Sequence, residues 1–102
     1  MNPNLSSGNK AYNITTNGTV TLPGKSVLIA LVVGVKGGSG NTVKIYDSNE
    51  TIGANDESKK GTIDTVNIFG RVDLGFFMGT GIYLVVGGGT APDITVIYAD
   101  TP

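Results

Sequence analysis

The sequence predicts an all-β protein built as an antiparallel β-sandwich. Three observations lead to this prediction. Apolar residues alternate with polar ones or form continuous runs, and they do not recur at the three- and four-residue spacing of a helix. These runs are rich in Val, Ile, Thr and Tyr, which strands favour. Turn sequences that contain Gly, Pro or Asn interrupt the runs about every eight to twelve residues, a spacing typical of sandwiches and barrels.

The first half of the chain contains four predicted strands, each followed by a turn sequence. The dipeptides Asn17-Gly18 and Pro23-Gly24 end the first two strands, and the glycine-rich loop 37–41 ends the third. The third strand is a continuous apolar run, whereas the second and fourth alternate. The predicted strands are residues 11–15, 19–22, 26–35 and 42–47.

The second half begins with residues 49–61, a charged and glycine-containing stretch that we expect to be a long exposed connection. A short strand is predicted within it, at Thr51–Ile52. Two further strands are expected on either side of Phe69-Gly70, and a hairpin closes the chain around a glycine-rich loop. These last strands are residues 62–68, 70–76, 81–86 and 93–99, with the loop at 87–92.

The predicted strands favour a jelly roll, because about eight short strands suit its two packed sheets. A chain of 102 residues has the length of one domain. We assign residues 11–102 to a single β-sandwich domain. Residues 1–10 precede it as a polar N-terminal arm, which we expect to become ordered only against another surface.

The composition limits the chemistry that the protein can perform. The chain has no cysteine and no histidine, which excludes disulfides, thiolate or imidazole metal ligands, and nucleophiles activated by histidine. Charged residues make up 15% and the net charge is −1, so nucleic acid is not an expected partner. The longest apolar run, Val27–Val35, is shorter than the roughly 20 residues that span a bilayer, and no signal peptide is recognised.

No motif in the sequence predicts a catalytic residue, a cofactor site or a metal site. The stretch Pro23–Ser26 resembles a phosphate-binding loop, but a β-branched strand follows it where a helix would be needed. Residues 47–53 begin like a calcium loop and then lack its third ligand and glycine. The eight carboxylates show no spacing that selects a pair for acid–base chemistry.

Two predicted strands are apolar on both faces, although one face of a sheet is usually polar when water covers it. This holds for residues 27–33 and 82–86. Either a loop or the N-terminal arm covers the second face, or another subunit does. Adjacent Phe76 and Phe77 cannot both enter one core if they are extended. The candidate residues of a subunit or capsid interface are Phe76, Phe77, Met78, Ile82, Tyr83 and Leu84.

Two segments carry a resemblance to a known family. The sequences VKIYDSNETIG and GTGIYLVVGGGTAPDITVIYAD resemble those of small virion proteins of tailed bacteriophages, most closely over the hairpin Gly81–Tyr98. The resemblance implies a capsid decoration, or cement, protein that lies on the outer surface of the head as a trimer. It implies the major capsid protein as partner, with no cofactor and no turnover.

We expect a structural virion protein that binds the outer surface of the phage head and stabilises it. The alternative is a tail or fibre surface module that binds a receptor or a carbohydrate. Sugar sites usually combine stacking aromatics with polar groups, and the chain has no tryptophan and only four tyrosines, so the alternative is less favoured. An enzyme is the least favoured class, because no recognisable catalytic motif is present.

Overall fold

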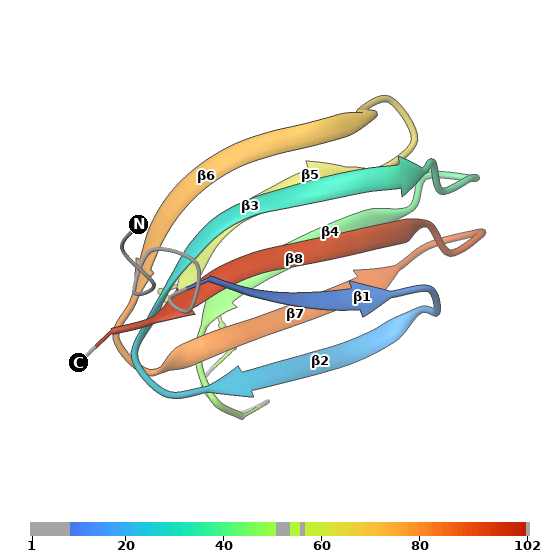
Figure 1. Ribbon diagram of the computed structural model, residues 1–102. Helices are drawn as coiled ribbons and strands as arrows, with labels where there is room; N and C mark the ends of the chain where they lie inside the picture. The colour runs from blue at the N-terminus through green and yellow to red at the C-terminus, as the bar shows by residue number, and fades with distance from the viewer. Residues whose placement is uncertain (1–8, 51–53, 56, 102) are drawn as a thin grey trace, which may run out of the picture.

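The computed structural model describes residues 9–50, 54, 55 and 57–101 of the chain. This part of the chain contains β-strands and no helix (Figure 1). The strands are β1 (Lys10–Ile14), β2 (Gly18–Pro23), β3 (Ser26–Val35), β4 (Thr42–Asp47), β5 (Lys59–Asp64), β6 (Gly70–Met78), β7 (Gly81–Gly87) and β8 (Asp93–Asp100).

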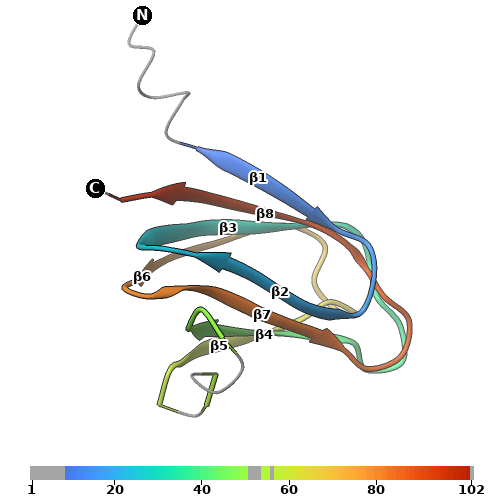
Figure 2. The ribbon, with the colours of Figure 1, turned by 90° about the horizontal axis from the view of Figure 1, so that it is seen from below.

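The eight strands form two four-stranded sheets that lie face to face (Figure 2). Sheet A has the strand order β1-β8-β3-β6, and sheet B has the order β2-β7-β4-β5. The antiparallel pairs are nested: β4 pairs with β5, β3 with β6, β2 with β7, and β1 with β8. This is a long hairpin folded over itself, which is the arrangement of a jelly roll. The prediction of an all-β sandwich of jelly-roll type is confirmed.

The predicted strand 62–68 has the wrong bounds at both ends. β5 begins at Lys59, within the stretch 49–61 that we expected to be an exposed connection, and it ends at Asp64, where a turn follows. The Asp64 carboxylate accepts hydrogen bonds from the backbone N–H groups of Val66 (2.9 Å) and Asn67 (3.3 Å), which gives the backbone an alternative to strand pairing. The predicted short strand at Thr51–Ile52 lies outside the described residues.

The N-terminal boundary also differs from the expectation. Lys10, the last residue of the expected arm, is the first residue of β1 and pairs with Tyr98 of β8. Residues 1–8 lie outside the described residues. Strand pairing therefore begins one residue before the predicted start of the domain.

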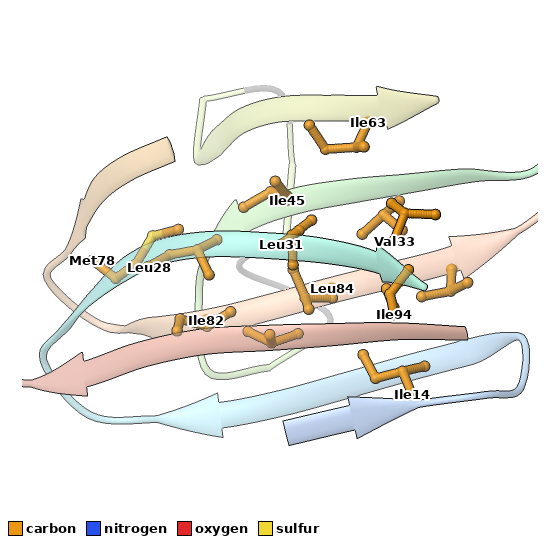
Figure 3. Packing of buried hydrophobic residues seen from close by; sticks show 13 residues of the cluster. Ile14, Leu28, Leu31, Val33, Ile45, Ile63, Met78, Ile82, Leu84 and Ile94 are labelled. Atoms are coloured by element: carbon orange, nitrogen blue, oxygen red, sulfur yellow. The ribbon is translucent and has the colours of Figure 1, made fainter. Parts of the chain in front are cut away.

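The core lies between the inner faces of the two sheets, and residues two apart along each strand contribute to it (Figure 3). Both sheets supply large aliphatic side chains that are almost completely buried. The buried core residues are Ile14, Leu28, Leu31, Val33, Val43, Ile45, Ile63, Met78, Ile82, Leu84, Val86, Ile94 and Val96.

Strand β3 contains a register shift, and the positions that face the core change from even to odd residue numbers at this shift. Its register against β8 shifts between Leu28 and Ala30, so that Ile29 is an extra residue on β3. Leu28 is in the core before the shift, and Leu31 and Val33 are in the core after it. Even-numbered residues face the core before the shift, and odd-numbered residues face it after the shift. Apolar residues therefore occur at both even and odd positions of β3. This explains part of the continuous apolar run in the sequence.

A buried asparagine joins the loops at one end of the sandwich. The Asn41 side chain has 0% exposure. Its Nδ2 donates to Oδ1 of Asn17 (2.9 Å) and to the backbone oxygen of Gly88 (2.8 Å), and its Oδ1 accepts from Oγ1 of Thr65 (2.6 Å). These partners lie before β2, after β7 and after β5. One amide therefore satisfies polar groups from three other connections.

At the opposite end, Asp47 holds the β6–β7 turn. Its carboxylate accepts hydrogen bonds from the backbone N–H groups of Gly79 (3.0 Å), Thr80 (2.8 Å) and Gly81 (3.3 Å). Partial burial acts to raise the pKa of Asp47, but these three donors and the nearby Lys60 ammonium outweigh it and hold the pKa below its ordinary value of 3.8.

The lowered pKa of Asp47 predicts a loss of stability in acid. A carboxyl whose folded pKa is depressed stabilises the fold above its unfolded pKa, and this contribution is lost as the pH falls through the folded value. We expect the urea midpoint to fall as the pH decreases below 3.8. Asp47→Asn should lower the free energy of unfolding at pH 7 by about 1 kcal/mol.

Urea titrations at several pH values between 7 and 2 check this prediction. The difference in stability between the wild type and Asp47→Asn should shrink as the pH falls, because protonation removes the charge from the wild-type acceptor as well. A difference that stays constant over this range would contradict the role of the Asp47 charge. Asp73→Asn is the matched control, because the Asp73 side chain is 81% exposed.

Candidate functional site

Two of the described carboxylates stabilise turns of the fold. Asp47 and Asp64 hold turns, and the side chain of Asn67 and the backbone N–H of Val66 hold the pKa of Asp64 below its ordinary value. The described part of the chain has no pocket, no group of three or more acidic residues placed to bind a metal, and no helix suited to cross a membrane. The candidate site is a surface.

The outer face of sheet A carries a strip of apolar side chains. They lie on the three neighbouring strands β6, β3 and β8, in positions that alternate with core residues or adjoin the shift in β3. Most are partly exposed, and none belongs to the core cluster. We call this surface the sheet A strip; it consists of Val27, Ile29, Val32, Phe77, Ile97 and Ala99.

The strip is densest at the end of the sheet where β6 finishes. Val27 of β3 pairs with Phe77 of β6 on one side and with Ala99 of β8 on the other. The three side chains thus form one row across three strands, with neighbouring strands about 4.8 Å apart. Phe77 is at the end of this row, on the edge strand β6, and it is 58% exposed. A row of this kind offers an apolar contact to another surface.

The charges beside the strip are paired within the chain. Nε of Arg71 donates to Oδ1 of Asp73 at 2.7 Å, both residues being on β6. The Lys10 ammonium at the start of β1 donates to the Asp100 carboxylate at the end of β8. This hydrogen bond and the Asp100 charge raise the pKa of Lys10. Each pair is neutral, so neither repels an apolar partner by net charge.

Three of the predicted interface residues are buried in the core. Met78, Ile82 and Leu84 have 0% exposure and belong to the core, so they offer no surface to a partner. Residue Phe76 is partly buried and packs against the core. Of the two phenylalanines that were expected to point in opposite directions, Phe77 faces outward.

Tyr83 occupies a different surface. It is buried although it lies on the outer face of sheet B, between Thr21 of β2 and Tyr46 of β4. Its ring meets the ring of Tyr46 edge to face, with centroids 6.3 Å apart. Neighbouring side chains therefore cover this predicted interface residue, and the six candidates do not lie together. Phe77 is the one that remains open to a partner.

Most of the strip lies outside the interface residues that the sequence predicts. Val27, Ile29 and Val32 belong to the apolar run 27–33, which is apolar on both faces, but they are not among the six predicted interface residues. Ile97 carries a similar signal, because it is apolar and directly follows the core residue Val96. What the sequence did not contain was the pairing of β3 with both β6 and β8, which brings Phe77, Val27 and Ala99 into one row.

No model of a known protein family matches the chain, and no curated protein matches it either. The functional expectations that come from the resemblance to phage virion proteins therefore stay predictions.

Proposed function

We propose that this protein is a structural virion protein, a capsid decoration or cement protein that binds the outer surface of a phage head and stabilises it. The partners in this proposal are the major capsid protein and further copies of the same chain, which assemble as a trimer on the shell. The observation that supports it best is the sheet A strip, with exposed Phe77 at one end. Apolar strips of this kind mark surfaces that bind other proteins.

The mechanism is binding without turnover. A contact that forms only with the assembled shell stabilises the shell by mass action, because the bound protein must be released before the shell can come apart. One apolar strip on a small domain makes a modest contact. Several copies that hold neighbouring capsid subunits at once bind far more tightly than one copy does, because the later contacts form within the same complex.

Phe77→Ser tests the role of the strip. The change removes the largest exposed apolar side chain of the row, and we expect retention on heads to fall about tenfold or more. The free energy of unfolding should change by less than about 1 kcal/mol, because Phe77 is exposed. Co-sedimentation of the purified protein with empty heads measures retention, and urea denaturation measures stability.

Phe69→Ser is the matched control. Phe69 is 66% exposed but lies in the β5–β6 connection, outside the strip. Its replacement should leave retention unchanged. Equal losses in both variants would indicate a general effect of surface hydrophobicity, and unchanged retention of Phe77→Ser would refute the assigned surface. Binding to isolated tails but not to heads would favour the tail or fibre module instead.

A further inference from the structure

The dipeptide Asn17-Gly18 is a chemically reactive pair, and it lies at the end of the sandwich where Asn41 is buried. Asn17 is the one asparagine of the chain that glycine follows. We propose that Asn17 is a site of spontaneous deamidation, and that its hydrogen bonds to Asn41 and Gly89 slow the reaction in the folded protein. This inference concerns the free protein and does not rest on the function proposed above.

The reaction begins when the backbone nitrogen of Gly18 attacks Cγ of Asn17. A bond forms between these two atoms and the bond from Cγ to Nδ2 breaks. The leaving nitrogen takes the proton of the Gly18 amide and departs as ammonia, which leaves a five-membered cyclic imide. Water then adds to Cγ or to the backbone carbonyl carbon of Asn17 and breaks the bond from that carbon to nitrogen, which takes a proton from the water. The products are aspartate and isoaspartate, and no oxidant or reductant is needed.

The surroundings of this pair suit both steps of the reaction. Gly18 has no side chain to shield its nitrogen, and a Cβ atom at this position would meet nothing within 4 Å. Glycine also adopts more backbone conformations than other residues, which helps the chain to reach the geometry of the attack. Asn17 is exposed, so water reaches the imide once it has formed.

The folded structure holds the Asn17 amide at both of its polar atoms. Nδ2 donates to the backbone oxygen of Gly89 (2.9 Å), and Oδ1 accepts from Nδ2 of Asn41 (2.9 Å). On the other side of the reacting bond, Gly18 is the first residue of β2 and pairs with Val86 of β7. The attack requires Cγ and the nitrogen to meet in one orientation at about 3–3.5 Å, and a side chain bonded to two other loops does not turn freely into it.

Asn41 is a firm anchor for this restraint because it is itself held by other loops. It is fully buried, and its amide also bonds the backbone oxygen of Gly88 (2.8 Å) and Oγ1 of Thr65 (2.6 Å). The connections that carry these residues lie together at one end of the sandwich (Figure 1). The rate at Asn17 should therefore follow how often this end of the sandwich opens.

Both products of the reaction are expected to weaken the same end of the sandwich. In the aspartate product an oxygen replaces Nδ2, and an ionised carboxylate has no proton to donate to the backbone oxygen of Gly89. In the isoaspartate product the main chain gains one atom directly before β2, where Gly18 pairs with Val86. Either change disfavours the closed network, so deamidation should promote further opening.

Peptide mapping by mass spectrometry tests the reactivity of the site. Wild-type protein is incubated at mildly alkaline pH, folded or in guanidinium chloride, and isoaspartate is separated from aspartate by chromatography. We expect Asn17 to react about tenfold or more faster in the unfolded chain than in the folded one. Asn49, an exposed asparagine followed by glutamate, is the matched control and should react more slowly than Asn17 in guanidinium chloride. Equal rates at Asn17 in the folded and unfolded chains would refute the proposed restraint, and equal rates at Asn17 and Asn49 in the unfolded chain would refute the proposed site.

Asn41→Ala tests the restraint within the folded protein. We expect Asn17 to react about fivefold or more faster in this variant than in the wild type. Thr65→Val removes the hydroxyl that donates to Asn41 and should give a smaller acceleration, which keeps the test usable if the alanine variant does not fold. Leu84→Val is the control, because it alters the core without touching the network and should leave the rate unchanged.

Two results of this comparison would overturn the proposal. Equal acceleration in Leu84→Val would show that the reaction follows unfolding of the whole domain. A slower reaction in Asn41→Ala would show that Asn41 promotes the attack, by donating to the oxygen that becomes negative.

Asn17→Asp measures the effect of the aspartate product. We expect a lower urea midpoint than that of the wild type, because the hydrogen bond to Gly89 is lost. Asn49→Asp makes the same change of charge at an exposed asparagine outside the network and should leave the midpoint nearly unchanged. An Asn17→Asp protein as stable as the wild type would contradict the role of the hydrogen bond from Asn17 to Gly89.

Discussion

Replacing Leu84 with alanine is expected to lower the free energy of unfolding by about 2–5 kcal/mol. Leu84 has 0% exposure and lies at the centre of sheet B, where β7 pairs with Val20 of β2 and Ile45 of β4. Figure 3 shows its side chain in the layer between the two sheets. Truncation removes the buried methyl groups and leaves a cavity that the surrounding strands fill only in part.

Urea denaturation followed by circular dichroism measures this effect. For a domain of this size the loss is a large part of the total stability, so Leu84→Val serves as a milder variant if the alanine variant does not fold. Val85→Ala is the matched control on the same strand, because Val85 is not part of the core and should cost less. A Leu84 variant with unchanged stability but weaker self-association would contradict the structure and support the original interface prediction.

Asn41→Ala is expected to lower the free energy of unfolding by about 1–3 kcal/mol. The change removes both donors that bind Asn17 and Gly88 and the acceptor that Thr65 uses. Because Asn41 is fully buried, water does not easily replace the lost bonds. The loops that meet at this end of the sandwich should also exchange their amide hydrogens faster than in the wild type.

Gly37→Ala provides a second route to the same network. A Cβ atom at Gly37 would lie 2.5 Å from Oγ1 of Thr65 and 2.8 Å from Cβ of Asn41, which is closer than these atoms can approach. We therefore expect a comparable loss of stability. Asn49→Ala, at an exposed asparagine, should change the stability by less than about 0.5 kcal/mol. Similar stabilities for all three variants would show that the buried amide contributes little.

Most strands could be predicted from the sequence because their signals are local. The run Ser26–Val35 is a strand with the predicted bounds, and Thr42–Asp47 is another. Their β-branched residues and flanking turns are sufficient signals. The end of β5 was mispredicted because Thr65 and Val66 look like strand residues, while the Asp64 side chain bonds the backbone that follows.

The candidate site was predicted less well. The sequence indicated that Phe76 and Phe77 point in opposite directions, but it could not say which one faces the core. Gly75 has a positive φ of 70°, and the register between β3 and β6 shifts beside it. The face of sheet A on which the Phe77 side chain lies therefore depends on the irregular pairing of β3 with β6, two strands that are distant in the sequence. An apolar residue has the same identity whether its side chain faces the core or a partner. The sequence therefore could not show that the core contains Met78, Ile82 and Leu84.

The amino-acid sequence determines by itself that this chain forms short antiparallel strands and that histidine- and cysteine-based chemistry is absent, because strand preference and side-chain chemistry belong to individual residues. The tertiary structure alone decides which apolar residues are buried and which form a surface. That outcome depends on the pairing of β1 with β8 from opposite ends of the chain and on the shift within β3. In a sheet, a change of one position moves a side chain to the other face.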